Sequence, residues 1–235
     1  RHMHEYGTTP EQLAEVAVTI RKHASMNPRA HQQKPLTVRD VLDSPMITSP
    51  LKRFDCALVS DGAAAAIITT ADRARDLKQK PVHLLGQGYG LSHSYVGEAM
   101  NLPHSGAVMS GKKAFAMAGV SHADIDVAEL YDCFTITVII ELEDLGFCKK
   151  GEGGPFVASG AIAPGGSLPV NTSGGGLSYC HPGMYGLLVM IEAIRQIRGE
   201  CGQRQVKGCD VALAQGNGGV LSSECTVIFG SEATL

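Results

Sequence analysis

The feature that most constrains this 235-residue chain is a glycine-dense stretch at residues 171–186. It reads Asn-Thr-Ser-Gly-Gly-Gly-Leu-Ser-Tyr-Cys-His-Pro-Gly-Met-Tyr-Gly and continues into an apolar segment with helical spacing. The three glycines Gly174–Gly176 allow backbone conformations and close approaches that a side chain would prevent. Pro182 suits the first turn of a helix, where its missing N–H is no loss. The stretch therefore predicts a shaped loop that presents His181 at a helix N-terminus.

His181 has two interpretations at this point. The positive end of a helix dipole disfavours the imidazolium, so the ring would stay neutral and could accept a proton. Alternatively, the loop is a tight crossover, and His181 is a hydrogen-bonded cap with no chemical role. Residue types alone leave both interpretations open.

Charge and hydropathy exclude two classes of partner. The net charge is −3 and the isoelectric point is about 6.3, so the chain lacks the basic field that binds a nucleic-acid backbone. No apolar run reaches the roughly 20 residues that span a bilayer, and the N-terminus lacks the apolar segment of a signal peptide. We expect a cytoplasmic protein without a membrane span and without a nucleic-acid partner.

The cysteines and histidines do not predict a metal site. The chain has seven dispersed cysteines and no Cys-x-x-Cys pair, which fits reduced thiols better than disulfides or zinc ligands. His2 and His4 have no third ligand at a suitable spacing. We therefore expect no metal and no resident cofactor.

The apolar pattern predicts an α/β fold. Helices are expected over residues 10–26, 37–42, 71–77, 107–118, 131–146 and 182–198, and strands over 61–69, 82–85, 126–130, 211–214 and 226–229. From Pro81 the order is β-α-β-α-α-β-β, which predicts a mixed sheet with helices on both faces. Gly86–Gly90 superficially matches a dinucleotide fingerprint, but the following segment is polar, which argues against nucleotide binding.

Three irregular segments lie at predicted ends of strands or helices, where catalytic groups gather in such sheets. They are residues 131–135, 171–183 and 215–220. We expect them to meet in one pocket. The residues with useful chemistry are Tyr131, Cys133 and His181, and Tyr185 adds a second phenol.

These segments resemble motifs of the thiolase superfamily, in particular the C-terminal part of sterol-carrier-protein-type thiolases and their thiolase-like lipid-transfer relatives. Asn171-Thr-Ser-Gly-Gly with Cys180-His-Pro-Gly is similar to the family's Asn-Pro-Ser-Gly-Gly and Gly-His-Pro loop. Tyr131-Asp-Cys-Phe is similar to its His-Asp-Cys-Phe loop, and Asp61-Gly-Ala-Ala-Ala to the strand that closes the first α/β half. The resemblance implies a thiolase-like layered fold that is incomplete at the N-terminus.

The resemblance also implies a division of the chain. Residues 1–55 would be the remainder of the loop or cap domain, residues 56–80 the last strand and helix of the first thiolase half, and residues 81–235 the C-terminal half. No cysteine here matches the family's acyl-accepting nucleophile. The resemblance thus implies a missing N-terminal half and a chain that is a fragment or one part of a split enzyme.

By resemblance, His181 would be the base and Cys133 a second acid/base, whose thiolate a nearby helix start would stabilise. The substrate and oxyanion loops would contain a set of residues matched to the family motifs: Asn171, Ser173, Gly174, Tyr185, Asn217, Gly218 and Gly219. Tyr131 stands where thiolases have a histidine, and the same tyrosine occurs in thiolase-like aldolases of steroid side-chain breakdown.

The resemblance leaves three functions open for an acyl-CoA substrate, with coenzyme A entering only as part of it. Cys133 and His181 favour a Claisen-type acyltransferase, whereas Tyr131 and Asn217 favour a retro-aldol lyase. Loss of two catalytic side chains favours a non-catalytic thiolase-like protein that binds acyl-CoA or lipid, or serves as a scaffold subunit. Implied partners are a second copy of the chain in a homodimer and a small protein with an OB-like fold.

Overall fold

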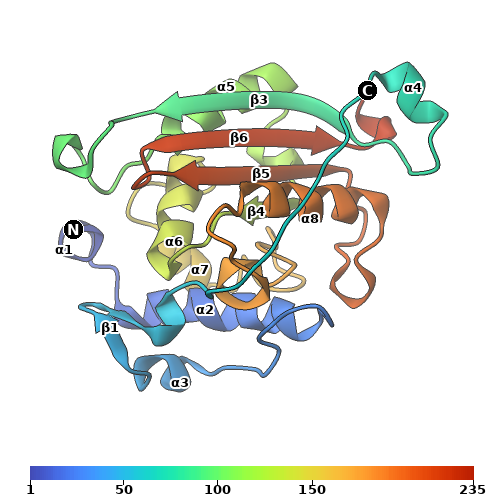
Figure 1. Ribbon diagram of the computed structural model, residues 1–235. Coiled ribbons are helices and arrows are strands. Elements are labelled where there is room, and N and C mark those ends of the chain that lie inside the picture. The colour runs from blue at the N-terminus through green and yellow to red at the C-terminus, as the bar shows by residue number, and fades with distance from the viewer.

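The computed structural model covers residues 1–235 and is built on a four-stranded sheet (Figure 1). Its strands are β3 (His83–Leu91), β4 (Val127–Leu130), β5 (Val211–Gly218) and β6 (Ser223–Gly230), in the spatial order β3-β6-β5-β4. Strands β4 and β5 are parallel, while β5–β6 and β6–β3 are antiparallel. The sheet is therefore mixed, as predicted.

The helices and a small hairpin complete the fold. The helices are α1 (His2–Tyr6), α2 (Pro10–Ser25), α3 (Val38–Leu42), α4 (Ala71–Arg75), α5 (Ala107–Ala118), α6 (Thr135–Asp144), α7 (Gly153–Ala158) and α8 (Gly186–Arg198). A two-stranded antiparallel hairpin pairs β1 (Met46–Thr48) with β2 (Leu51–Lys52), and Gly175–Tyr179 forms a single π-helical turn. None of the helices combines the length and hydrophobicity that a membrane span requires.

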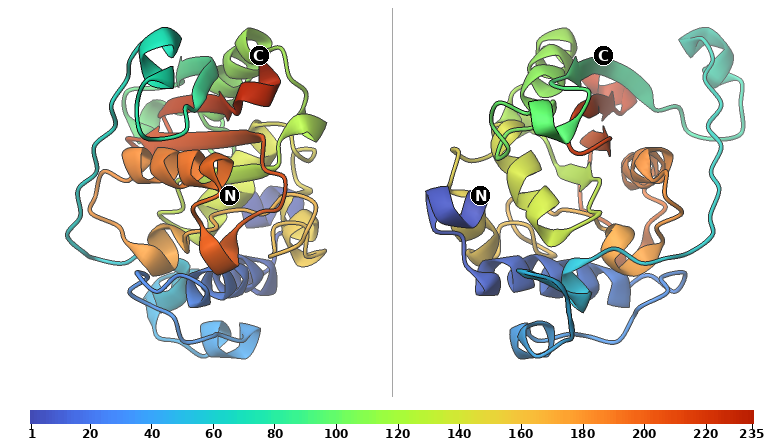
Figure 2. Two further views of the ribbon diagram at one scale, coloured as in Figure 1. Left: turned by 90° about the vertical axis from the view of Figure 1, so that its right-hand side faces the viewer. Right: turned by 60° about the vertical axis from the view of Figure 1, so that its left-hand side comes forward.

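Helices cover both faces of the sheet, as two views of the ribbon show (Figure 2). Val211 and Leu213 of β5 belong to the core cluster that includes residues of α2, α5 and α6. The alternate residues Ala212 and Ala214 belong to a second cluster that includes residues of α8. Successive side chains of a strand point to opposite faces, so α8 lies on one face and α5 and α6 on the other. The predicted α/β class with helices on both faces is confirmed.

Helix α2 forms a layer below the sheet domain (Figure 1). It begins with a capping box: Thr9 accepts a hydrogen bond from the Gln12 backbone, and the Gln12 side chain accepts one from the Thr9 backbone. Leu13, Val16 and Ile20 form an apolar stripe that joins the main core cluster. Helix α2 also packs against the π-helical turn, and so supports the glycine-rich loop.

The Gly86–Gly90 run lies inside β3 and not in a loop after a shorter strand, as the sequence had suggested. A Cβ atom on Gly86, Gly88 or Gly90 would stand only 2.0–2.3 Å from a backbone oxygen of α5. These oxygens belong to residues 114, 110 and 106, one helical turn apart. The glycines therefore let α5 lie directly on β3, which explains their spacing without a nucleotide.

Residues 61–69 do not form the predicted buried strand. The segment from Ala57 to Thr70 is extended without strand partners and runs along the outside of the molecule, as both views show (Figure 2). Val59, Ile67 and Ile68 are largely exposed. A strand needs a neighbour to satisfy its backbone, and the local apolar pattern cannot supply one.

Other boundaries differ from the predictions for local reasons. Helix α8 begins at Gly186, four residues after Pro182, because Gly183 has a left-handed φ of 83° that interrupts a helix. Helix α7 lies in a segment for which the sequence analysis predicted no helix. Strand β5 continues to Gly218, so part of the expected final loop is paired with β6.

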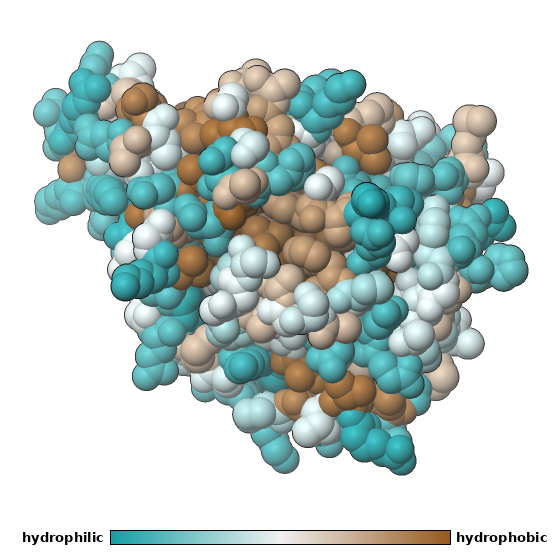
Figure 3. All heavy atoms as spheres, turned by 180° about the vertical axis from the view of Figure 1, so that it is seen from behind, coloured by the Kyte–Doolittle hydropathy of each residue, from teal (hydrophilic) through white to brown (hydrophobic).

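The rear of the molecule, seen from the side opposite to Figure 1, carries apolar side chains on its surface (Figure 3). They gather in the upper centre and again near the lower rim, among polar residues. Helix α5 covers this side of the sheet and leaves Val108, Met109 and Met117 partly or largely exposed.

Candidate active site

The three irregular segments singled out in the sequence meet at one cavity of about 430 Å³. Its lining comes from the loop after β4, the loop before α8, the end of β5, and Cys56 with the first residues of the extended segment 57–70, here called the strap. The lining residues are Cys56, Ala57, Leu58, Val59, Tyr131, Cys133, Phe134, His181, Gly183, Asn217, Gly218 and Gly219. Segments that are far apart in sequence thus form one site, as predicted.

Tyr131 and His181 form the polar centre of this cavity. The hydroxyl of Tyr131 lies 3.1 Å from Nε2 of His181 and 3.1 Å from the carbonyl oxygen of Gly183, to which it can donate. The two rings lie with their centroids 5.4 Å apart. A phenol and an imidazole in direct hydrogen-bond contact provide a donor and a base at the same point.

The neutral state of His181 has a different cause from the one expected. Because α8 begins five residues later, its dipole does not act on the ring as it would at the helix terminus. Burial of the half-exposed ring lowers the pKa of His181, and the nearby Leu58 backbone opposes this shift only in part. The lowered pKa agrees with the expected neutral ring, but desolvation replaces the helix dipole as its reason, and the role of base stays a prediction.

This shift gives a pH prediction. A general base must be unprotonated, and the pKa of His181 is lowered from the usual 6.5, so activity should persist into mildly acidic solution. We expect the acid limb of the kcat/KM profile of the full-length gene product to have its midpoint below pH 6.5. An acid limb centred above pH 6.5 would contradict a desolvated His181 as the base.

Cys133 is a neutral thiol, and the expected thiolate is wrong. It lies two residues before the first residue of α6, and its sulfur lies 3.4 Å from Oγ1 of Thr137. Burial nevertheless raises the pKa of Cys133 to about 11, and the Glu141 and Asp132 carboxyls add to the shift. Desolvation therefore outweighs the helix start. At neutral pH this group can give a proton but cannot act as a thiolate nucleophile.

Four of the expected substrate-loop residues do not line the cavity but are buried behind it. Asn171 has a positive φ of 55° and accepts a hydrogen bond from the Leu130 backbone, which holds the end of β4. Ser173 accepts one from the Gly175 backbone, and Gly174 lies against α2. Tyr185 is fully buried, with its ring centroid 5.5 Å from that of Tyr131. These residues shape the loops that surround the cavity.

Asp132 joins two of the loops, and the sequence analysis gave it no role. Its carboxyl accepts hydrogen bonds from the backbone N–H groups of Gly176 at 2.6 Å and Leu177 at 3.1 Å. Burial raises the pKa of Asp132 to about 7, although these N–H groups favour the charged form. Its place inside the Tyr131–Phe134 motif was the signal that could have identified it.

The fourth wall of the cavity was also missed. The backbone N–H of Ala57 donates to the carbonyl of Cys133 at 2.9 Å, and that of Leu58 to the carbonyl of Gly176 at 3.0 Å. The hydroxyl of Ser60 accepts from the backbone N–H of His181 at 2.8 Å. These residues have no distinctive side-chain chemistry, so nothing in the sequence marked them as part of the site.

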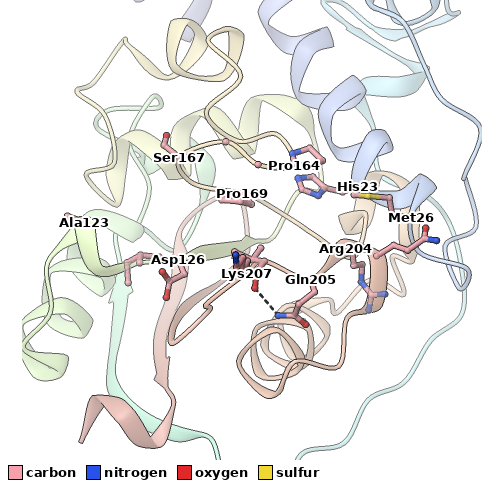
Figure 4. A pocket seen from close by; sticks show the side chains of 15 residues that line it. His23, Met26, Ala123, Asp126, Pro164, Ser167, Pro169, Arg204, Gln205 and Lys207 are labelled. Carbon is pink, nitrogen blue, oxygen red and sulfur yellow. Dashed lines mark hydrogen bonds between the residues drawn. The ribbon is translucent and has the colours of Figure 1, made fainter.

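A second cavity, of about 540 Å³, lies at the opposite end of β4 (Figure 4). Asp126, which precedes β4, lines it, whereas Tyr131, which follows β4, lines the first cavity. Two of its charged side chains already have partners: Arg204 bonds Glu192 through two nitrogens, and Asp126 accepts from the backbone N–H groups of Asp210 and Val211. Burial lowers the pKa of His23 to about 4. The first cavity, which is the smaller, therefore has the side chains better suited to catalysis.

Three known proteins are similar to this chain over nearly all of its length. The acetyl-CoA acetyltransferase of Methanothermobacter thermautotrophicus is 40% identical over 231 residues, which cover 97% of this chain and 60% of that protein. The 17-hydroxy-3-oxo-4-pregnene-20-carboxyl-CoA lyase of Mycobacterium tuberculosis is 42% identical over 233 residues, 95% of this chain and 58% of that protein. The chain thus spans about three fifths of the length of these relatives.

A solved structure shares the fold. The Ltp2-ChsH2(DUF35) aldolase superposes with a TM-score of 0.91 at 36% identity, over 100% of this chain and 62% of the matched chain. The family model described as thiolase C-terminal domain-like matches residues 88–231. This range contains the segments with Tyr131, Cys133, His181 and Asn217. The chain therefore belongs to the thiolase superfamily, in its thiolase C-terminal domain-like family.

Proposed function

We propose that the protein cleaves the carbon–carbon bond of a β-hydroxyacyl-CoA by retro-aldol chemistry, with Tyr131 in place of the thiolase histidine. The observation that carries this proposal is the contact between the Tyr131 hydroxyl and His181 Nε2 beside an uncharged Cys133 thiol. This set combines a neutral base, a phenolic donor and a weak acid in one cavity. The lyase and aldolase relatives support the same class of reaction.

The proposed reaction needs one proton to be taken and one to be given. His181 takes the proton of the β-hydroxyl, and Tyr131 donates a hydrogen bond to the oxygen as its negative charge develops. The bond between the α and β carbons then breaks, a ketone or aldehyde leaves, and the electron pair forms the thioester enolate. Cys133 gives its proton to the α carbon and recovers one from His181. Backbone N–H groups of Gly218 and Gly219 are proposed to hold the thioester oxygen.

An acyltransferase is the second candidate, because the 40% identical relative from Methanothermobacter is an acetyl-CoA acetyltransferase. Acyl transfer through a cysteine requires an accessible thiolate. Burial raises the pKa of both cysteines that line the cavity, Cys56 and Cys133. This candidate therefore depends on a nucleophile from outside this chain, and the retro-aldol reaction needs none.

We also propose that the site is completed by other parts of an assembly. The matched relatives are longer than this chain, which fits an additional α/β half. The similar solved structure is an assembly of Ltp2 with ChsH2(DUF35), which supports a small partner protein. The exposed apolar residues of the 57–70 strap support an association at that surface. A homodimer remains a prediction.

Two substrates and one variant test the proposal. The full-length gene product, with any small partner encoded beside it, is incubated with a branched β-hydroxyacyl-CoA and separately with acetoacetyl-CoA plus CoA. We expect a ketone and a shortened acyl-CoA from the first substrate. Tyr131→Phe should lower this cleavage about 10²-fold, since one donor to a developing oxyanion is lost.

Tyr89→Phe is the matched control, because Tyr89 is exposed on β3 and bonds only Ser223. It should leave the rate unchanged. Thiolysis of acetoacetyl-CoA with an acyl-enzyme detected by mass spectrometry would favour the acyltransferase. Binding of both substrates without any turnover would favour a non-catalytic scaffold.

A further inference from the structure

Asn217 lines the cavity, but its side chain makes hydrogen bonds that the sequence did not indicate. Its Nδ2 donates to the backbone carbonyl of Tyr131 at 2.9 Å and to Oε1 of Glu141 at 2.8 Å. The amide group has two N–H bonds, and both are used. Asn217 therefore has no side-chain donor left for a thioester oxyanion.

The orientation of this amide is fixed by its neighbours. If the group were reversed, its carbonyl oxygen would face the Tyr131 carbonyl, and two acceptors would lie at hydrogen-bond distance without a proton between them. Asn217 thus connects the end of β5 to the residue that follows β4. The connection ends on the main chain of Tyr131, whose hydroxyl contacts His181 at 3.1 Å.

Glu141 anchors this connection from the interior. It lies on α6, is fully buried, and has Asn217 as its only side-chain hydrogen-bond partner. Its second oxygen, Oε2, is buried without a partner, as is Oε1 of Glu224. Burial, and after it the neighbouring Glu224 charge, raises the pKa of Glu141 well above its usual range. Burial of a carboxyl oxygen without a hydrogen-bond partner costs free energy. The one side-chain hydrogen bond of Glu141 goes to Asn217, which lines the cavity.

We propose that Glu141 is a positioning residue, which acts through the Asn217 amide to hold Tyr131 against His181. This inference rests on the proposed function, since it assigns a cause to the geometry of the Tyr131–His181 pair. The hydrogen bond with Asn217 is the only one that joins the Glu141 side chain to a residue of the cavity lining. Its effect should appear on the chemical step and on the environment of His181, and not on general substrate affinity.

Three variants of the full-length gene product test this inference. Glu141→Gln removes the ionisable group but keeps an oxygen that can accept from Asn217. Glu141→Leu keeps the volume but removes the acceptor, and Asn217→Asp removes both donors. We measure kcat, KM and the titration of the His181 ring by NMR. Glu152→Leu, the same change at an exposed position, is the matched control.

We expect Glu141→Leu and Asn217→Asp to lower kcat about tenfold or more with little change in KM, whereas Glu141→Gln retains most of kcat. The His181 pKa should rise toward 6.5 in the first two variants, because a displaced Tyr131 exposes the ring to water. Circular dichroism checks that each variant is folded. If Glu141→Leu does not fold, Glu141→Gln still tests the inference.

The titration and the kinetics separate two kinds of failure. If the wild type does not cleave a β-hydroxyacyl-CoA but the His181 titration responds as expected, the proposed reaction is wrong and the positioning role stands. If the wild type is active and Glu141→Leu changes neither kcat nor the His181 titration, the positioning role is wrong. The same conclusion follows if Glu141→Gln is as impaired as Glu141→Leu.

Discussion

Replacing His181 by alanine should lower kcat/KM of the full-length gene product about 10²- to 10⁴-fold, the range that general acid–base catalysis supplies. The variant loses the only imidazole that lines the cavity and leaves the Tyr131 hydroxyl without its ring partner. Burial raises the pKa of the other titratable groups that line the cavity, Tyr131, Cys133 and Cys56, so none of them can replace His181 as a base near neutral pH. The measurement is the rate of ketone release from a β-hydroxyacyl-CoA.

The loss should be confined to the chemical step. His31→Ala serves as the control, because His31 is exposed and uses only its backbone N–H in a hydrogen bond. Substrate affinity, measured by equilibrium binding, should change by less than tenfold in His181→Ala. Retention of more than a tenth of wild-type turnover would show that His181 is not the base.

Gly88→Ala should produce the largest loss of stability among conservative single changes in the sheet. The added methyl group would lie 2.0 Å from the carbonyl oxygen of Ser110, on the backbone of α5, and 2.8 Å from the Lys113 Cβ. Neither the strand nor the helix can yield locally, because β3 is paired to β6 along its length. We expect the free energy of unfolding to fall by about 3 kcal/mol, at the upper end of overpacking effects.

Chemical denaturation followed by circular dichroism measures this change. Gly186→Ala is the matched control, because a Cβ at this first residue of α8 would meet only a Gly216 atom at 3.9 Å. Its effect should stay within about 1 kcal/mol, and a helical position can even gain from alanine. If both variants lost the same free energy of unfolding, the glycines of β3 would not act by allowing close contact between β3 and α5.

Local sequence patterns predicted most of the fold because the relevant interactions are local. The Thr9–Gln12 capping box, the apolar stripe of α2 and the Gly119 end of α5 are each specified by residues within a few positions of one another. The pattern at 61–69 failed for the opposite reason. Its alanines and isoleucines suit a buried strand, but burial depends on a neighbouring chain that no local pattern can provide.

The sequence indicated which loops meet, but not the electrostatics of the cavity. The structure places Tyr131, Cys133, His181 and Asn217 around one cavity, because loops at the ends of adjacent strands meet at one edge of the sheet, and the role of each residue stays a prediction. The charge state of Cys133 was wrong, since helix proximity is visible in a sequence but the depth of burial is not. The contact of Glu141 with Asn217 joins residues 76 positions apart and has no sequence signal. The division of the chain at residues 55 and 80 remains a prediction.

The strap that begins at Ala57 is attached to both catalytic loops at once. Its first residues bond the carbonyls of Cys133 and Gly176, Ser60 bonds the backbone of His181, and the Asp61 carbonyl accepts from the Cys180 thiol, while most of the residues that follow are exposed. A displacement of the strap would therefore shift the backbone of the loops that carry Cys133 and His181, because three hydrogen bonds connect them. A molecule that binds the strap could in this way change the distance between these two side chains.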